Sequence, residues 1–122
     1  MPELINVLLV DDNSKYLKDA LPFYGYEVTT AFDGIQALKE LANKSKNFDI
    51  VLLDVMMPNM NGLNATRAIR ELNRIDSNLP IIALSANAYA EDIKKTKDAG
   101  MDDYVSKPFK IENLVEMIDK YC

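Results

Sequence analysis

The sequence is organised around one stretch, residues 48–62, FDIVLLDVMMPNMNG. Residues 50–53 form an unbroken run of leucine and β-branched residues, which predicts a strand buried on both faces. Asp54 follows this run directly, and Pro58 and Gly62 then mark a loop. In open α/β sheets, ligands bind beyond the carboxyl ends of the strands. The position of Asp54 therefore indicates a functional site, although an acid that merely ends a strand fits this stretch alone equally well.

Size and composition exclude several classes of function. A chain of 122 residues predicts a single domain, residues 1–122. The formal net charge of −5 argues against direct binding of nucleic acid, because phosphate contacts need clustered Lys and Arg. The sequence has no histidine, which excludes a histidine-based triad, a histidine zinc site and an internal phosphohistidine.

The expected location follows from the cysteine count and the hydropathy. The only cysteine is Cys122, so no internal disulfide can form, which is typical of a reducing compartment. The sequence shows neither a secretory leader nor an apolar run long enough to cross a membrane. We therefore expect a cytoplasmic protein without membrane contact.

Strand and helix patterns alternate along the chain. Apolar, β-branched runs predict strands over residues 4–10, 26–31, 50–54, 78–85 and 103–106. A helical pattern follows each strand, which implies a parallel sheet with right-handed crossovers and helices on both faces. The predicted fold class is therefore α/β, a doubly wound (βα)5 domain whose five-stranded parallel sheet has the flavodoxin-like order 2-1-3-4-5.

The predicted helices differ in length and in the strength of their apolar faces. They are expected over residues 14–21, 35–44, 63–74, 86–99 and 111–118. Pro22 and Gly25 limit the first to a shortened helix. The fourth has only a thin apolar stripe of Tyr89, Ile93 and Ala99, whereas the last has the clearest one.

Polar residues follow several strands where the predicted sheet brings the strand ends together. Strands one and three are neighbours in this order, so Asp11, Asp12 and Asp54 converge, with Ser85 and Lys107 at the ends of the next two strands. Two unit charges 4 Å apart cost about 4 kcal/mol at an effective dielectric constant near 20. A Mg²⁺ ion would relieve this repulsion, since it prefers oxygen ligands, and three acids, one lysine and one Mg²⁺ sum to zero charge.

Phosphoryl transfer is the chemistry that suits these residues. It depends mainly on positioning and on charge neutralisation, and a carboxylate can accept the phosphoryl group as an acyl phosphate. Lys107 can hold one phosphoryl oxygen as a point charge, and Ser85 can donate a hydrogen bond to another. The constellation predicts a Mg²⁺-dependent aspartyl-phosphate site with Asp54 as the nucleophile.

Four motifs in the same order resemble those of a known family. They are VDDN at residues 10–13, DVMMPNMNG at 54–62, LSA at 84–86 and GMDDYVSKPF at 100–109. Each is weak alone, but together, each at a strand end, they are specific. Over nearly its whole length the sequence resembles the receiver domain of two-component response regulators, both stand-alone chemotaxis-type regulators and the receivers of hybrid kinases.

The resemblance implies a role for each residue of the site. Asp54 would take a phosphoryl group from a phosphohistidine on a sensor histidine kinase or a histidine phosphotransfer protein. Asp12, Asp54 and the backbone carbonyl of Met56 would bind Mg²⁺, and Asp11 would hold the ion through water. Lys107 would contact the phosphoryl group. Ser85 would move to form a hydrogen bond with it, and Tyr104 would then turn inward.

The same resemblance implies how the signal leaves the domain. The face formed by the fourth helix, fifth strand and fifth helix would change for a downstream protein target or an attached domain. The bond between Lys107 and Pro108 would be cis. The first helix, which in the family often helps to dock the histidine partner, would be shorter than usual by about one turn.

Three alternatives remain at this point. A degenerate receiver would bind partners without phosphorylation, but the intact set of acids, Ser85 and Lys107 argues against it. An aspartate-nucleophile phosphatase would place a second acid where Met56 stands. A flavodoxin-like cofactor binder needs a phosphate loop where the chain has Asp11 and Asp12, which would repel the flavin phosphate.

Overall fold

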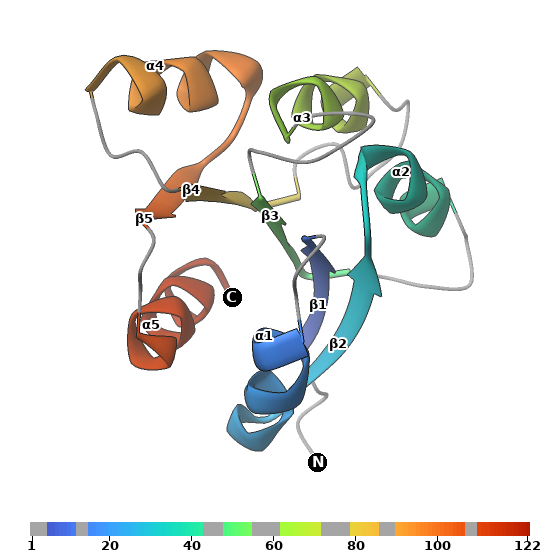
Figure 1. The fold of residues 1–122 in the computed structure, drawn as a ribbon, viewed down its shortest axis with the longest axis vertical. Coiled ribbons are helices and arrows are strands. Elements are labelled where there is room, and N and C mark those ends of the chain that lie inside the picture. Colours follow the sequence, from blue (N-terminus) through green and yellow to red (C-terminus); the bar gives the residue numbers. More distant parts are fainter. Residues whose placement is uncertain are drawn as a thin grey trace.

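The fold is a parallel sheet covered by helices on both faces (Figure 1). The computed structural model describes residues 5–11, 15–42, 48–54, 62–71, 79–85, 90–106 and 110–122. The strands are β1 (Ile5–Val10), β2 (Tyr26–Ala31), β3 (Ile50–Asp54), β4 (Ile81–Ser85) and β5 (Asp103–Ser106). The helices are α1 (Lys15–Ala20), the 3₁₀ helix η1 (Leu21–Tyr24), α2 (Gly34–Ala42), α3 (Gly62–Glu71), α4 (Ala90–Ala99) and α5 (Ile111–Tyr121).

The sheet has the predicted order, β2-β1-β3-β4-β5, with every pair parallel. β3 lies at its centre, and all five of its residues are buried. Such a strand needs apolar side chains on both faces, which explains the continuous run before Asp54. The predicted fold class, a flavodoxin-like (βα)5 domain with a shortened first helix, is confirmed.

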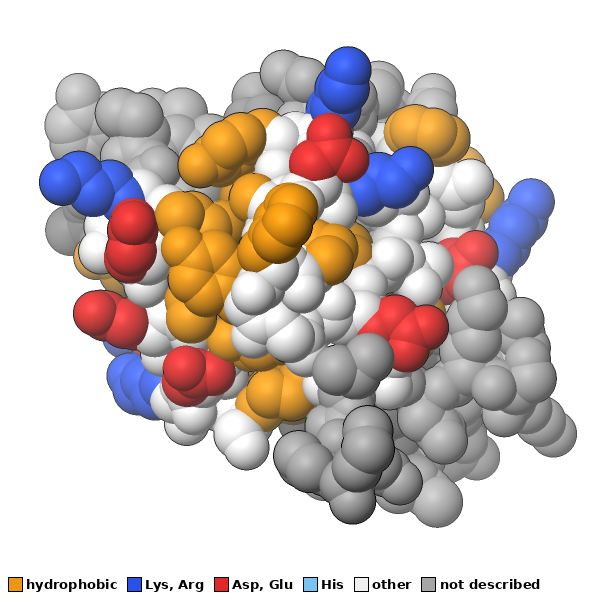
Figure 2. Space-filling view, turned by 90° about the horizontal axis from the view of Figure 1, so that it is seen from below, with side chains coloured by type: hydrophobic (Ala, Val, Ile, Leu, Met, Phe, Trp, Pro, Cys, Tyr) orange, Lys and Arg blue, Asp and Glu red, His pale blue; other side chains and the backbone are white. Residues whose placement is uncertain are grey.

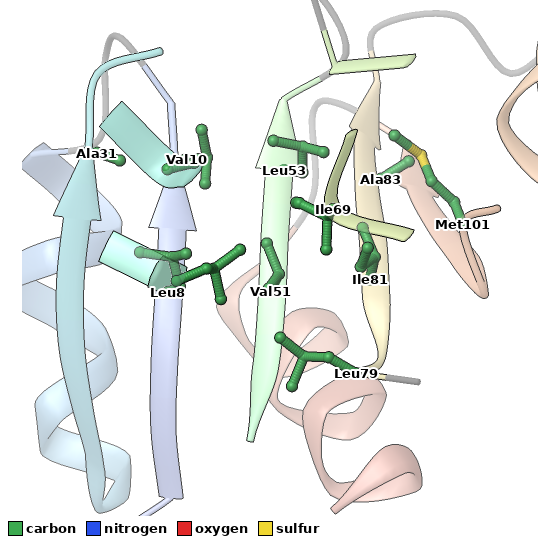
Figure 3. Close-up of a cluster of buried hydrophobic side chains, with 12 residues drawn as sticks. Leu8, Val10, Ala31, Val51, Leu53, Ile69, Leu79, Ile81, Ala83 and Met101 are labelled. Atoms are coloured by element: carbon green, nitrogen blue, oxygen red, sulfur yellow. The ribbon is translucent and has the colours of Figure 1, made fainter. Parts of the chain in front are cut away.

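Each face of the sheet carries its own apolar cluster. One cluster joins Leu8, Val51 and Ile81 of the sheet to Leu41 of α2 and Ile69 of α3. Figure 3 shows Leu8, Val51 and Ile81 of this cluster on β1, β3 and β4. Burying a leucine or isoleucine stabilises the fold by about 1.5–3 kcal/mol, so this cluster is a main support of the sheet.

The second cluster lies on the opposite face, beneath α1 and α5. Leu9 and Leu52 of the sheet pack there with Leu21 of η1 and with Leu114 and Ile118 of α5. All five side chains are fully buried. Because successive strand residues point to opposite faces, the two clusters alternate along β1 and β3.

The first helix is short because a 3₁₀ turn takes the place of its last α-helical turn. α1 has 6 residues, and a 3₁₀ turn of 4 residues then begins at Leu21, with Pro22 in second place. Gly25 caps its end in the left-handed conformation, with φ of 90°. A proline inside an α-helix would remove a backbone hydrogen bond, whereas it fits near the start of a new turn. Leu21 on this turn is fully buried, so η1 still anchors the segment to the sheet.

The other helices follow the predictions with local differences. Ile35 is an apolar residue of α2, yet it is 47% exposed. The buried positions of that helix are Gly34, Ala37 and Leu41. Ala99 and Thr96 supply buried contacts from α4. The predicted extensions of three helices, over residues 43–44, 72–74 and 86–89, lie outside the described residues.

Candidate functional site

Asp54 is the last residue of the central strand, and its side chain is almost completely buried, with 6% exposed. It pairs in register with Leu84 of β4. The strand is held by fully buried neighbours, Leu52 and Leu53 among them, so Asp54 has little freedom to move. The fold thus fixes one carboxylate at the carboxyl edge of the sheet.

Asp11 lies beside it on the neighbouring strand. Val10 pairs with Leu53 in the parallel ladder between β1 and β3, so Asp11 and Asp54 each stand one residue beyond that pair. The backbone N–H of Asp11 donates to the carbonyl of Ala31 at 3.1 Å, which ties the residue to the end of β2. Asp11 is 4% exposed. Two carboxylates therefore lie buried on adjacent strands, which are about 4.8 Å apart.

The same edge continues across β4 and β5. Ser85 ends β4, one residue beyond the pair formed by Asp54 and Leu84, and it pairs with Ser106 at the end of β5. Lys107 follows Ser106 in the sequence but lies outside the described residues. The backbone thus places Asp11, Asp54 and Ser85 in one row along the edge, and Lys107 follows the strand that extends this row.

Part of the predicted site lies outside the described residues, namely Asp12, Met56 and Lys107 with its bond to Pro108. Within the described ranges, no group of three or more His, Cys, Asp or Glu side chains is arranged to hold a metal ion. The two acids that are described, Asp11 and Asp54, fit part of a magnesium site, because Mg²⁺ prefers carboxylate oxygens.

Tyr104 lies in the middle of β5, in register with Ala83 of β4. Its side chain is half-buried and packs against the cluster that contains Ile69 and Met101. The resemblance implies that this ring turns inward on phosphorylation, which stays a prediction. In the structure the ring rests against the core on one side. Its position leaves it two strands away from Asp54.

Asp103, the residue before Tyr104, joins β5 to the last helix. Its carboxylate accepts hydrogen bonds from the Tyr104 N–H at 2.9 Å, the Tyr121 hydroxyl at 3.0 Å and Lys120 Nζ at 3.2 Å. Burial would raise the pKa of Asp103, but these three donors outweigh it and lower the pKa. The pKa of Tyr121 is raised by burial and by the same carboxylate. The hydrogen bonds of Asp103 to Lys120 and Tyr121 therefore link β5 to α5.

Sequence patterns indicate no role for Asp102 or for Arg70. In the structure Arg70 Nη2 lies 2.9 Å from Asp102 Oδ2, in an ion pair that links α3 to the turn before β5. No local pattern in the sequence signals this contact, because the two residues are 32 positions apart. Asp102 directly precedes β5, so the pair lies at the opposite end of this strand from Ser106.

The arrangement defines a class of protein. It is a flavodoxin-like, doubly wound α/β domain with buried acids at the topological switch point, where the strand order reverses between β1 and β3. Residues 7–119 of the chain match the family described as the response regulator receiver domain. The chain belongs to this family, whose members are phosphorylation-activated switches of two-component signalling.

The most similar relatives by sequence include hybrid kinases. The chain is 42% identical over 120 residues to hybrid signal transduction histidine kinase I of Dictyostelium discoideum, with 93% of the chain and 7% of that protein covered. It is also 42% identical over 120 residues to the sensor histidine kinase RcsC of Escherichia coli K12, with 95% of the chain and 12% of RcsC covered. The chain therefore spans about a tenth of the length of these relatives.

Solved structures agree on the fold. The chemotaxis response regulator CheY4 of Vibrio cholerae superposes with a TM-score of 0.89 at 30% identity, covering 98% of this chain and 99% of CheY4. The receiver domain of the sensor histidine kinase PA1611 from Pseudomonas aeruginosa gives 0.86 at 37% identity, with 97% of each chain covered. That structure holds a magnesium ion in its active-site cleft.

Proposed function

We propose that Asp54 of this receiver domain accepts a phosphoryl group from a phosphohistidine on a sensor histidine kinase or a histidine phosphotransfer protein. A carboxylate oxygen of Asp54 bonds to phosphorus while the bond from phosphorus to the donor's imidazole nitrogen breaks, and the imidazole leaves after taking up a proton. The observation that carries the proposal is the buried carboxylate of Asp54, 6% exposed, at the carboxyl end of the central strand beside Asp11.

We assign a Mg²⁺ ion to the carboxylates of Asp12 and Asp54 and to the backbone carbonyl of Met56, with Asp11 holding the ion through water. The burial of Asp11 and Asp54 on neighbouring strands supports this assignment, because like charges so placed repel each other. When bound, the ion neutralises charge on the acids and on the phosphoryl oxygens. The magnesium ion in the PA1611 receiver domain supports the choice of metal.

Lys107 and Ser85 complete the proposed phosphoryl contacts. Ser85 ends β4, one residue past the partner of Asp54, which supports a hydrogen bond from its hydroxyl to a phosphoryl oxygen. Lys107 comes directly after Ser106, the partner of Ser85, which supports a charge contact from the other side. Both groups favour the phosphorylated form, because Lys107 balances the charge that phosphorylation adds and the Ser85 hydroxyl donates a hydrogen bond to it.

The proposed output surface is formed by α4, β5 and α5. On phosphorylation Ser85 would move toward the phosphoryl group and Tyr104 would turn inward behind it. Tyr104 stands at the junction of these elements, since its neighbour Asp103 is bonded to Lys120 and Tyr121 of α5. A downstream protein target, or a domain attached in a longer protein, would recognise the changed face.

The same site is proposed to hydrolyse its own acyl phosphate, so the chain acts on itself and not on a separate substrate. We also propose that the chain binds proteins and does not bind nucleic acid or membranes directly. The acidic net charge of −5 supports the first exclusion. In the part of the chain that the structure describes, no helix is long and apolar enough to span a membrane.

The phosphohistidine partner is proposed to contact α1, which begins close to the acidic edge. Tyr16 on this helix is 65% exposed, an unusual exposure for a large aromatic side chain. Further along, η1 exposes Phe23 and Tyr24. Figure 2 looks onto the molecule from the side of η1 and shows hydrophobic side chains gathered at the middle of this face, bordered by charged ones. Such an exposed patch supports protein contact.

The test of the proposed function is the intact mass after incubation with acetyl phosphate and Mg²⁺. We expect one phosphoryl adduct on the wild-type protein and none on Asp54→Asn or in a sample treated with chelator. No adduct on the wild type would overturn the proposal and favour a receiver that binds partners without phosphorylation. An unchanged adduct on Asp54→Asn would overturn the choice of nucleophile.

A further inference from the structure

Arg70, near the end of α3, joins three separate segments of the backbone. Its guanidinium donates from Nη1 to the carbonyl of Leu79 at 2.7 Å and from Nε to the carbonyl of Gly100 at 2.9 Å. From Nη2 it donates to Asp102 Oδ2 at 2.9 Å. The planar guanidinium can serve several acceptors at fixed angles, which a lysine cannot do. One side chain thus links α3 to the residues that lead into β4 and into β5.

Asp102 in turn extends the ladder between β4 and β5. Its backbone N–H donates to the carbonyl of Ile81 at 2.9 Å, and its carboxylate accepts from the N–H of Ile81 at 2.9 Å. The regular pairing of the two strands begins one residue later, at Ile82 and Asp103. The Asp102 side chain therefore replaces a backbone acceptor at the start of the ladder, and Arg70 holds that side chain in place.

The turn between α4 and β5 is shaped to fit Arg70. Gly100 has a φ of 107°, a conformation that favours glycine. A Cβ atom at this position would lie 3.0 Å from Arg70 Cγ, so the absence of a side chain also makes room for the arginine. Met101, the next residue, is buried in the cluster that supports Tyr104. The position of Arg70 and the path of this turn depend on each other.

We propose that Arg70 is a positioning residue for phosphoryl transfer, acting through Asp102 on the placement of β5. By fixing the start of the ladder between β4 and β5, it determines where Tyr104 and the end of the strand lie. Ser106 lies four positions after Asp102 along the extended strand, a span of about 13 Å. The proposal rests on the proposed function, because Tyr104 and the end of β5 belong to the proposed site and its output surface.

A purely stabilising role is the competing explanation. Ion pairs that are partly exposed add little to stability, and here the side chains of Arg70 and Asp102 are 22% and 39% exposed. Of the three described hydrogen bonds of Arg70, two go to the backbone carbonyls of Leu79 and Gly100, which precede β4 and β5, so they can fix the course of the backbone there. The two roles differ in one observable, the rate of phosphorylation of fully folded protein.

The experiment compares Arg70→Gln, Arg70→Lys and Asp102→Asn with Arg67→Gln. Arg67 is a matched control, because it lies on the same helix and its described hydrogen bond goes to Asn64 of that helix. Each variant is checked for folding by circular dichroism and then phosphorylated with acetyl phosphate and Mg²⁺. Amide NMR spectra are recorded for the unphosphorylated proteins.

We expect Arg70→Gln to slow phosphorylation about tenfold, less than the ~10²-fold cost of misplacing a reacting group by 1 Å. The amides of Tyr104 and Ser106 should shift while those of β1 and β2 do not. Arg70→Lys should not restore the rate, because a lysine lacks the fork of donors. Asp102→Asn should slow the reaction in the same direction, and Arg67→Gln should match the wild type.

Wild-type rates in folded Arg70→Gln and Asp102→Asn would overturn the positioning role while leaving the proposed function intact. A wild-type protein that takes no phosphoryl group would instead overturn the proposed function, and this inference with it. Should Arg70→Gln fail to fold, Asp102→Asn decides the question, since it keeps the arginine and removes only the charge of its partner.

Discussion

At the scale of single residues, the acids of the site are placed at a cost to stability. Asp11 and Asp54 are 4% and 6% exposed and stand on adjacent strands. Two like charges about 5 Å apart repel by about 3 kcal/mol at an effective dielectric constant near 20. Stability is commonly sacrificed in this way where a function requires it. This repulsion between the two carboxylates would favour binding of a cation, or of a phosphoryl group whose charge a cation balances.

We therefore predict that Asp54→Asn stabilises the protein in the absence of Mg²⁺. The free energy of unfolding should rise by about 1–3 kcal/mol, because one of the two repelling charges is removed. Urea denaturation in a chelating buffer measures it. The control is Asp98→Asn, an exposed position on α4 that should change little. A loss of stability in Asp54→Asn alone would show that Asp54 is a net stabilising residue.

At the scale of elements, sequence patterns predicted what depends on local chemistry. The run before Asp54 predicted β3, and Pro22 with Gly25 predicted the short α1. The outward position of Ile35 was not predictable, because the apolar spacing of α2 allows more than one rotation of the helix.

Part of the site could also be predicted from local sequence patterns. The parallel order followed from the alternation of elements, and it brings Asp11, Asp54 and the end of β4 to one edge. The links made by Arg70 could not be predicted, since they join positions 9 to 32 residues apart and leave no periodic signal. Roles for Asp12, Met56 and Lys107 remain predictions, because these residues lie outside the described part.

The two glycines with positive φ provide a test at this scale. Gly25 has open space around its missing Cβ, whereas at Gly100 a Cβ would lie 3.0 Å from Arg70 Cγ. We predict that Gly25→Ala costs about 1–2 kcal/mol for the backbone conformation alone. Gly100→Ala should cost about 1 kcal/mol more, because it also crowds the arginine. Urea denaturation of both variants measures the difference, and equal losses would contradict the fit of Arg70 to this turn.

At the scale of the whole molecule, the edge strand β2 is joined to the last helix, α5, across one face of the sheet. The Tyr26 hydroxyl on β2 donates to Asp119 Oδ1 on α5 at 2.8 Å, across 93 positions of sequence. Tyr26 itself is buried in the cluster beneath α1 and α5. Burial raises the pKa of Tyr26, and the bond to Asp119 raises it further. The edge strand and the last helix are thereby coupled.

This link predicts a pH dependence. A tyrosine whose pKa is raised on folding stabilises the folded state below its ordinary pKa of 10.0, and that contribution is lost as the pH rises through the folded value. Tyr26→Phe should lower the free energy of unfolding by about 1 kcal/mol at neutral pH. It should also flatten the decline of stability above pH 10. A decline as steep as that of the wild type would contradict the link, with Tyr24→Phe as the exposed control.

The central claim is that Asp54, and no other acid, carries the phosphoryl group. The most direct measurement is reduction of the phosphorylated protein with borohydride, which converts an aspartyl phosphate to homoserine, followed by peptide mass spectrometry. We expect homoserine at position 54 alone, and only after incubation with both phosphodonor and Mg²⁺. Homoserine at Asp11 or Asp12, or an unmodified Asp54 in protein that carries the adduct, would contradict it.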